Sequence, residues 1–204
     1  MKLTWYGHAC FKLETASGSV VFDPYAPGSV PGLALPEITA DAVVCSHRHS
    51  DHYCPEAVTL TGSEPSFAMC SIPTFHDECM GAKRGDNLIT VVTAEGLTVA
   101  HCGDLGHELS AETLSSLGKI DILLIPVGGV YTLDAEAAKC VCEQIKPTVT
   151  VPMHYRCGSA GLQNIAPVDD FLSLFDEASI TRLPSNTLTI ETPLTESVTV
   201  LELG

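Results

Sequence analysis

Four side chains that can bind metal fall within six residues, in the segment His-Arg-His-Ser-Asp-His at residues 47–52. The segment follows an apolar run at residues 42–46 that is typical of a strand, so it is expected to form a loop. His47 and His49 are two apart and point to the same side of an extended chain, whereas Asp51 and His52 lie beyond a bend. This spacing favours two neighbouring metal ions over one.

Three further candidate ligands, His76, Asp104 and His154, each follow a later strand-like run. We expect them along the same edge of the fold as the His-rich loop, because strand ends collect at one edge. The expected ligands are His47, His49 and His76 for the first ion, Asp51, His52 and His154 for the second, and Asp104 between them. Imidazole and carboxylate suit zinc and also accept manganese or iron. Seven ligands with room for water indicate a catalytic centre.

A pair of metal ions predicts a particular chemistry. Two cations a few ångströms apart lower the pKa of a shared water enough to supply hydroxide at neutral pH, and they polarise a carbonyl or phosphoryl oxygen. No side-chain nucleophile is then required. Asp51 is the predicted catalytic residue, because a ligand that also touches this water can orient it and take up its proton.

Two charged residues and one tyrosine are candidates for the rim of the site. Lys83 and Arg84 form the only Lys-Arg pair of the chain, a few residues beyond His76. They suit an anion clamp for a phosphate or carboxylate, and equally a solvated turn between two glycines. Tyr131 is a candidate hydrogen-bond donor to substrate or to an oxyanion, and equally an ordinary packed tyrosine.

The remaining histidines and the cysteines are not predicted to be ligands. His8, His101 and His107 are interpreted as outer partners that orient the ligands. The nine cysteines are odd in number and include no Cys-x-x-Cys motif, which favours reduced thiols over disulfides or a zinc ribbon. The four near proposed ligands in the sequence are expected to be bystanders: Cys54, Cys79, Cys102 and Cys157.

The elements that must position these residues alternate along the chain. Strands are expected at residues 3–6, 10–15, 19–23, 42–46, 71–75, 88–92, 97–100, 120–127 and 148–152, and two or three more close the chain. The run at residues 42–46 reads as a strand buried on both faces. Helices are expected to begin at Pro55, to cover residues 110–117 and 134–145, and to run from Pro167 with Val168, Phe171, Leu172, Phe175 and Ala178 on one face. This order predicts an α/β fold, a four-layer αββα sandwich.

Composition narrows the partners. A chain of 204 residues with 45% apolar residues fits one globular domain over residues 1–204. A formal net charge of −15 disfavours binding to long nucleic acids, because their phosphates would be repelled. The N-terminus lacks a signal-peptide pattern and no run is long enough to cross a bilayer, so a cytoplasmic protein with a small-molecule substrate and no membrane partner is predicted. No feature of the sequence indicates an oligomeric state.

Residues 46–52 resemble the His-x-His-x-Asp-His signature of the metallo-β-lactamase-fold hydrolases. Further segments are similar to the compact bacterial branch of Zn-dependent or ascorbate-lactonase-like hydrolases: Gly7-His8-Ala9-Cys10-Phe11, Phe22-Asp23-Pro24-Tyr25, Gly103-Asp104-Leu105-Gly106-His107, Ile125-Pro126-Val127-Gly128-Gly129 and Pro152-Met153-His154-Tyr155. The resemblance covers nearly the whole chain. It implies the αββα sandwich and the same seven ligands that the spacing predicts.

Departures from other branches of that family narrow the function. The chain is too short for the inserted domain of the RNA-processing branch, and His49 stands where the oxygen-reducing di-iron branch has a glutamate. The predicted function is an intracellular metal-dependent hydrolase of a small ester, lactone or phosphodiester, favoured as anionic. The alternatives are a nuclease or cyclic-nucleotide phosphodiesterase, and a metal-binding member of the fold without turnover.

Overall fold

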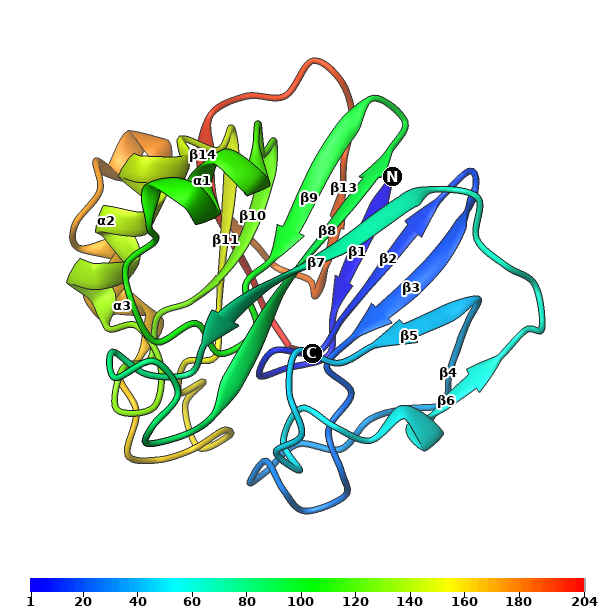
Figure 1. The fold of residues 1–204 in the computed structure, drawn as a ribbon, viewed down its shortest axis with the longest axis horizontal. Coiled ribbons are helices and arrows are strands. Elements are labelled where there is room, and N and C mark those ends of the chain that lie inside the picture. Colours follow the sequence, from blue (N-terminus) through cyan, green and yellow to red (C-terminus); the bar gives the residue numbers. More distant parts are fainter. Residues whose placement is uncertain (204) are drawn as a thin grey trace.

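Two β-sheets packed face to face form the centre of the computed structural model, which describes residues 1–203 (Figure 1). The smaller sheet contains β1 (Lys2–Trp5), β2 (Phe11–Thr15), β3 (Gly18–Phe22), β5 (Ala42–Val44) and β13 (Thr187–Thr189). Its strand order is β13-β1-β2-β3-β5. Strands β1, β3 and β5 run in the same direction, so their carboxyl ends lie at one edge of this sheet.

The larger sheet has seven strands. They are β7 (Ala68–Phe75), β8 (Asp86–Ala94), β9 (Leu97–His101), β10 (Ile122–Pro126), β11 (Val149–Met153), β12 (Ile180–Leu183) and β14 (Ser197–Leu201). Their order is β12-β14-β11-β10-β9-β8-β7. Strands β9, β10 and β11 are parallel, and β7 has the same direction because β8 is antiparallel to both β7 and β9. The carboxyl ends of these four strands therefore share one edge.

Apolar side chains from both sheets fill the space between them. Trp5 and Phe11 of the smaller sheet belong to the same buried cluster as Leu124 and Val151 of the larger one. Burial of such side chains stabilises the fold by roughly 1.5–3 kcal/mol each. This shared core fixes the two sheets relative to each other, and with them the two edges that carry the chemistry.

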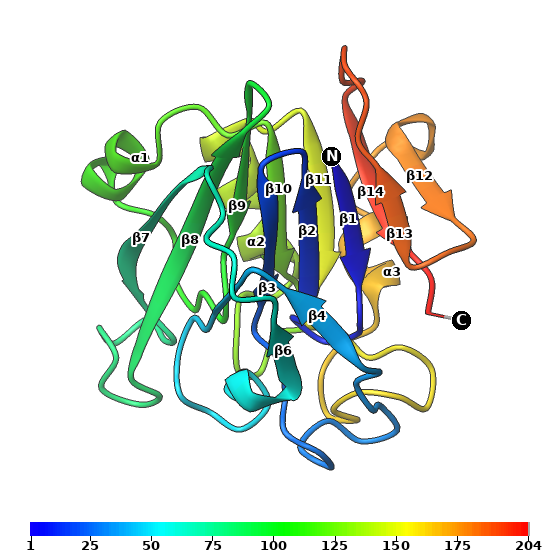
Figure 2. The same cartoon turned by 90° about the vertical axis from the view of Figure 1, so that its right-hand side faces the viewer.

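The three α-helices of the described chain lie on the outer side of the larger sheet (Figures 1 and 2). They are α1 (Ala111–Leu117), α2 (Ala135–Ile145) and α3 (Val168–Leu172). The side chains of Ser110 and Asp134 cap α1 and α2 by accepting the N–H groups of Thr113 and Ala137. The helices expected at residues 110–117 and 134–145 are confirmed. None of the helices in residues 1–203 is long and apolar enough to cross a membrane.

A different layer covers the outer face of the smaller sheet. It consists of β4 (Ile38–Ala40), β6 (Val58–Leu60), a 3₁₀ turn (Pro55–Ala57) and the connecting loops, and Figure 2 shows β4 and β6 in front of the sheet. A second apolar cluster, with Val21, Tyr25 and Ile38, lies beneath it. The predicted sandwich of two sheets is confirmed. Within residues 1–203, however, this fourth layer contains no α-helix, and the helix expected to begin at Pro55 is one 3₁₀ turn followed by a strand.

Two other expectations from the sequence are wrong. The run at residues 42–46 is not buried on both faces, because β5 is the edge strand of the smaller sheet and its residues are half-buried. The helix from Pro167 ends at Leu172 instead of continuing to Ala178, which is exposed in a 3₁₀ turn. The chain must turn there to enter β12 at Ile180, so the apolar periodicity continues further than the helix.

Candidate metal centre

The carboxylate of Asp23 organises the His-rich loop from both of its ends. Asp23 directly follows β3 and is buried, and it accepts hydrogen bonds from the backbone N–H (2.7 Å) and hydroxyl (2.6 Å) of Ser46. His52 Nδ1 donates to the same carboxylate at 2.8 Å. The loop between Ser46 and His52 is thereby folded back on itself, with His52 Nε2 directed away from Asp23. The sequence reasoning gave Asp23 no role, although an aspartate at the end of a buried strand was the available signal.

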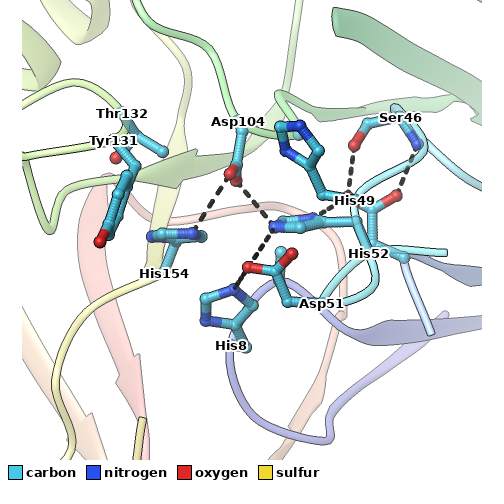
Figure 3. A network of polar contacts seen from close by, with 12 residues as sticks. His8, Ser46, His49, Asp51, His52, Asp104, Tyr131, Thr132 and His154 are labelled. Atoms are coloured by element: carbon cyan, nitrogen blue, oxygen red, sulfur yellow. Dashed lines mark hydrogen bonds and ion pairs between the residues drawn. The ribbon is translucent and has the colours of Figure 1, made fainter. Parts of the chain in front are cut away.

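Asp104 lies at the centre of the site, where Figure 3 shows it between His52 and His154. Its Oδ2 is 3.0 Å from His76 Nε2 and 3.3 Å from His154 Nε2, and its Oδ1 is 3.1 Å from His52 Nε2. The preceding Gly103 has a φ of +55°, and a Cβ there would lie 2.4 Å from both Asn87 Oδ1 and Ser46 Cβ. Only glycine fits the turn that brings Asp104 to this position.

The ligands predicted for the first ion converge on one side of Asp104. His47, His49 and His76 offer ligand atoms that all lie within 4.8 Å of one another. Nδ1 of His76 donates to the backbone carbonyl of Tyr131 at 3.1 Å, which leaves the lone pair of Nε2 free to bind a cation. Nδ1 of His47 contacts the Ser46 hydroxyl at 2.9 Å. His49 is exposed to solvent, unlike His76.

The ligands predicted for the second ion converge on the other side of Asp104 and gain one member. Asp51, His52 and His154 form a group with His8, again with ligand atoms within 4.8 Å of one another. Nε2 of His8 is 3.3 Å from Asp51 Oδ2, a contact marked in Figure 3. All seven residues predicted as ligands are therefore brought together. His8, interpreted from the sequence as an outer partner, lies among them.

The donor set fits a pair of divalent cations. Among residues 1–203, five buried side-chain atoms lack a hydrogen-bond partner: His8 Nδ1, His52 Nε2, Asp104 Oδ1, His154 Nδ1 and His154 Nε2. Every one belongs to this cluster. Buried polar atoms are costly to leave unpaired, and imidazole nitrogens and carboxylate oxygens are the atoms that zinc and similar ions bind. These residues can thus hold such ions.

Burial and mutual contact set the charge states of the cluster. Burial lowers the pKa of His8 and of His47 to about 3, so both imidazoles are neutral at pH 7. Burial alone would also lower the pKa of His52, but the carboxylates of Asp104 and Asp23 raise it well above its usual value. Burial likewise opposes ionisation of Asp104, yet His154 and His52 hold the pKa of its carboxyl group well below the usual range.

A cleft of about 390 Å³ opens over the cluster and is lined by Asp51, Asp104, Arg84 and Tyr131, among others. Nη2 of Arg84 donates to the Val130 carbonyl at 2.8 Å, and its guanidinium carbon lies 5.7 Å from the centre of the Tyr131 ring. Lys83 instead forms an ion pair with Glu78. Of the two residues considered for an anion clamp, Arg84 lines the cleft and Lys83 does not.

The buried carboxylate of Asp77 holds the loop that carries Arg84. It accepts the backbone N–H groups of Cys79, Gly81, Lys83 and Arg84, at distances of 2.8–3.1 Å. Beside Arg84, the hydroxyl of Tyr131 accepts from Asn164 Nδ2 at 2.7 Å. Both rim residues therefore have defined positions. No sequence pattern singled out Asp77 or Asn164.

The other residues considered in the sequence lie outside the ligand groups. His101 is buried beneath the site, where Nε2 donates to the Ala9 carbonyl at 2.8 Å. His107 accepts the Phe75 N–H at 3.1 Å and so supports the strand that ends before His76. All nine cysteines are free, and within the described residues none belongs to a ligand group.

The sequence family described as the beta-lactamase superfamily domain matches residues 2–154 of this chain. The chain belongs to the metallo-β-lactamase superfamily. It is 32% identical over 200 residues to a "UPF0173 metal-dependent hydrolase" of Methanoculleus marisnigri, covering 81% of this chain and 85% of that protein. It is 37% identical to a solved structure from Thermotoga maritima, a proposed Zn-dependent hydrolase of the superfamily, with a TM-score of 0.78 and coverage of 98% and 97%.

The superfamily fold also supports other chemistry. CmlA, a diiron β-hydroxylase from Streptomyces venezuelae, is 14% identical, with a TM-score of 0.55 over 75% of this chain and 44% of that protein. This likeness concerns the fold alone. The reaction must therefore be argued from the site itself.

Proposed function

We propose that this chain is a metal-dependent hydrolase with a dinuclear centre, zinc by its donor set, acting on a small anionic ester, lactone or phosphodiester. The observation that carries the proposal is the position of Asp104, whose carboxylate lies 3.0–3.3 Å from imidazoles of both ligand groups. One carboxylate shared by two groups is suited to bridging two ions. Names of relatives such as "UPF0173 metal-dependent hydrolase" support the same activity.

When bound, two such cations supply a hydroxide at neutral pH and polarise the oxygen under attack. Asp51 is the protein group best placed to manage the proton. It lines the cleft, and its side chain is 22% exposed. An ionised carboxylate beside the reacting water can orient it and accept its proton.

The rim favours an anionic substrate of small size. A cleft of about 390 Å³ admits a small molecule, and Arg84 places a guanidinium group at its wall. Guanidinium groups match carboxylate and phosphate geometry, and the Tyr131 ring beside Arg84 holds it in place. Against a net charge of −15, this fixed cation provides a local attraction for an anion.

The organisation of the protein follows the same proposal. One domain over residues 1–204 is supported by the apolar cluster that draws side chains from both sheets. The seven ligands remain those predicted from the sequence: His47, His49, Asp51, His52, His76, Asp104 and His154. We further propose a cytoplasmic enzyme that acts on a small molecule, without a long nucleic acid or a membrane as partner.

The first test is metal content of the purified protein, measured by mass spectrometry together with turnover of chromogenic esters, lactones and phosphodiesters. We expect about two transition-metal ions per chain and turnover of at least one substrate that a chelator abolishes. His47→Ala and Asp104→Ala should lose metal and turnover, whereas Glu136→Gln, an exposed position on α2 outside the ligand groups, should keep both. Wild-type protein that binds no metal after reconstitution would contradict the proposal.

The same panel separates the alternative functions. Chelator-sensitive cleavage of cyclic nucleotides or of an oligonucleotide, tested beside the chromogenic substrates, would indicate a cyclic-nucleotide phosphodiesterase or a nuclease. Two bound ions without any turnover would indicate a metal-binding member of the fold that is not an enzyme. Arg84→Met should raise KM for anionic substrates roughly 10- to 100-fold and leave KM for neutral substrates unchanged, because it removes one charge-assisted contact worth roughly 1.5–3 kcal/mol. Equal effects on both substrate types would argue against the anion clamp.

A further inference from the structure

His8 occupies a sharp turn that follows β1 and faces the cluster. The preceding Gly7 has a φ of +95°, and a Cβ there would lie 2.5 Å from Leu33 Cδ1. His8 itself has a φ of +54°, in the left-handed region that residues other than glycine seldom adopt. Non-glycine residues held in this region often mark functional sites, where the surrounding structure maintains the strain.

The backbone of this turn is held from two directions. The carbonyl of His8 accepts the indole N–H of Trp5 at 3.0 Å and the backbone N–H of His154 at 3.1 Å. His154 also has a positive φ, of +52°. Two strained turns, one at the end of each sheet, are therefore hydrogen-bonded to each other, and this fixes the two imidazoles with ring centres 4.0 Å apart.

The side chain of His8 has the surroundings of a ligand. It is 2% exposed, and it does not line the cleft. Its ring lies beside the rings of His52 and His154. Figure 3 shows His8 next to His154 and Asp51. Within residues 1–203, its Nδ1 has no hydrogen-bond partner.

The contact between His8 Nε2 and Asp51 Oδ2 measures 3.3 Å. An N–H···O hydrogen bond is typically about 2.7–3.2 Å long. Two ligand atoms at tetrahedral corners, each about 2.0–2.2 Å from zinc, lie roughly 3.3–3.5 Å apart. The observed separation therefore matches two ligands of one ion better than a strong hydrogen bond.

We propose that His8 is a fourth protein ligand of the second metal site, together with Asp51, His52 and His154. The inference rests on the proposed dinuclear centre. His8 does not line the cleft, so as a ligand it would leave the cleft side of the site open to water and substrate. The second site would then offer four protein side chains besides Asp104, and the first site three histidines.

Substitutions that differ in ligand chemistry test this assignment. His8→Gln keeps a hydrogen-bond donor but offers only a weak ligand, and we expect metal content to fall from about two ions to about one. His8→Cys offers a thiolate, which binds zinc and cobalt strongly, and we expect two ions again. With cobalt, His8→Cys should gain a sulfur-to-metal charge-transfer absorption that the wild type lacks. Near-ultraviolet circular dichroism checks the fold of each variant.

A measurement on the wild type keeps the test independent of folding of the variants. In protein loaded with an NMR-active cadmium isotope, direct scalar coupling between cadmium and the ring of His8 is expected. Absence of that coupling, or a His8→Gln variant with two tightly bound ions, would overturn the inference and leave His8 as a positioning residue for Asp51. Wild-type protein without any bound metal would instead overturn the proposed function, so the two failures are distinguishable.

Discussion

The two halves of the site differ in how they meet solvent. The first group, His47, His49 and His76, includes the exposed His49 and opens toward the cleft. In the second group, the imidazoles of His8, His52 and His154 are no more than 2% exposed; Asp51 and His154 line the cleft, and His8 and His52 do not.

This difference assigns different tasks to the two halves. Buried imidazoles would restrict the position of an ion in the second half, and the carboxylate of Asp51 at the cleft could take up a proton. The exposed His49 of the first half would leave more room for a substrate to reach an ion there. We therefore expect the second half to determine the geometry of the reacting water and the first half to receive the substrate.

The largest effect is expected from Asp104→Ala, which removes the carboxylate shared by both halves. Both ions should be lost, and turnover should fall by roughly three orders of magnitude or more, because two-metal stabilisation of the transition state is worth several kcal/mol. Metal analysis and initial rates measure this. Loss of a single ion would show that Asp104 serves one half only.

Asp51→Asn separates chemistry from metal binding within the second half. The carboxamide still has an oxygen that can face the ion, so much of the metal should remain, but it cannot accept the proton. We expect kcat to fall about 10²–10⁴-fold in metal-replete protein. An unchanged rate in a variant that holds two ions would remove Asp51 from the catalytic role.

Asp23→Asn weakens the support of His52 and should affect the second half more than the first. Loss of an outer carboxylate that orients a ligating histidine typically costs 10–100-fold in metal affinity. Titration of metal-free protein with zinc should show weaker binding of one of the two ions. Asp41→Asn is the matched control. Asp41 precedes β5 and accepts the backbone N–H of Ser19 near the start of β3, but it lies outside the ligand groups.

The pH dependence should also come mainly from His52. Asp104 and Asp23 raise the pKa of this imidazole well above 6.5, so it is protonated at neutral pH in protein freed of metal by a chelator. An incoming ion must displace that proton. Metal affinity should therefore rise with pH from 6 to 8, and binding should release protons. Calorimetry in buffers of different ionisation enthalpy measures the release, and pH-independent binding would contradict this origin.

The convergence of the seven predicted residues could be predicted because it depends on local sequence patterns. Histidines and aspartates directly after strand-like runs must collect where parallel strands end, and the structure brings all seven predicted residues together there. Their role as ligands remains a prediction. His8 was missed as a member of the cluster because its approach depends on the turn at Gly7 and on a hydrogen bond from His154, which lies far along the chain.

The errors in the fold have the same origin. Residues 42–46 are apolar enough for a central strand, but the position of β5 at the edge of its sheet is a property of the whole topology. The apolar face from Val168 to Phe175 describes which side chains pack inward, and it does not reveal that β12 begins at Ile180. Local patterns indicate burial better than they indicate where an element ends.

The distribution of the cluster over the two sheets has a mechanical consequence. His8, Asp23 and the His-rich loop follow strands of the smaller sheet, whereas His76, Asp104 and His154 follow strands of the larger one. Any ion bound here is therefore a cross-link between the two halves of the sandwich. Because such an ion binds only the assembled protein, it stabilises the folded state by an amount that grows with its free concentration. The supply of metal in the surroundings would then regulate the lifetime of the folded chain as well as its activity.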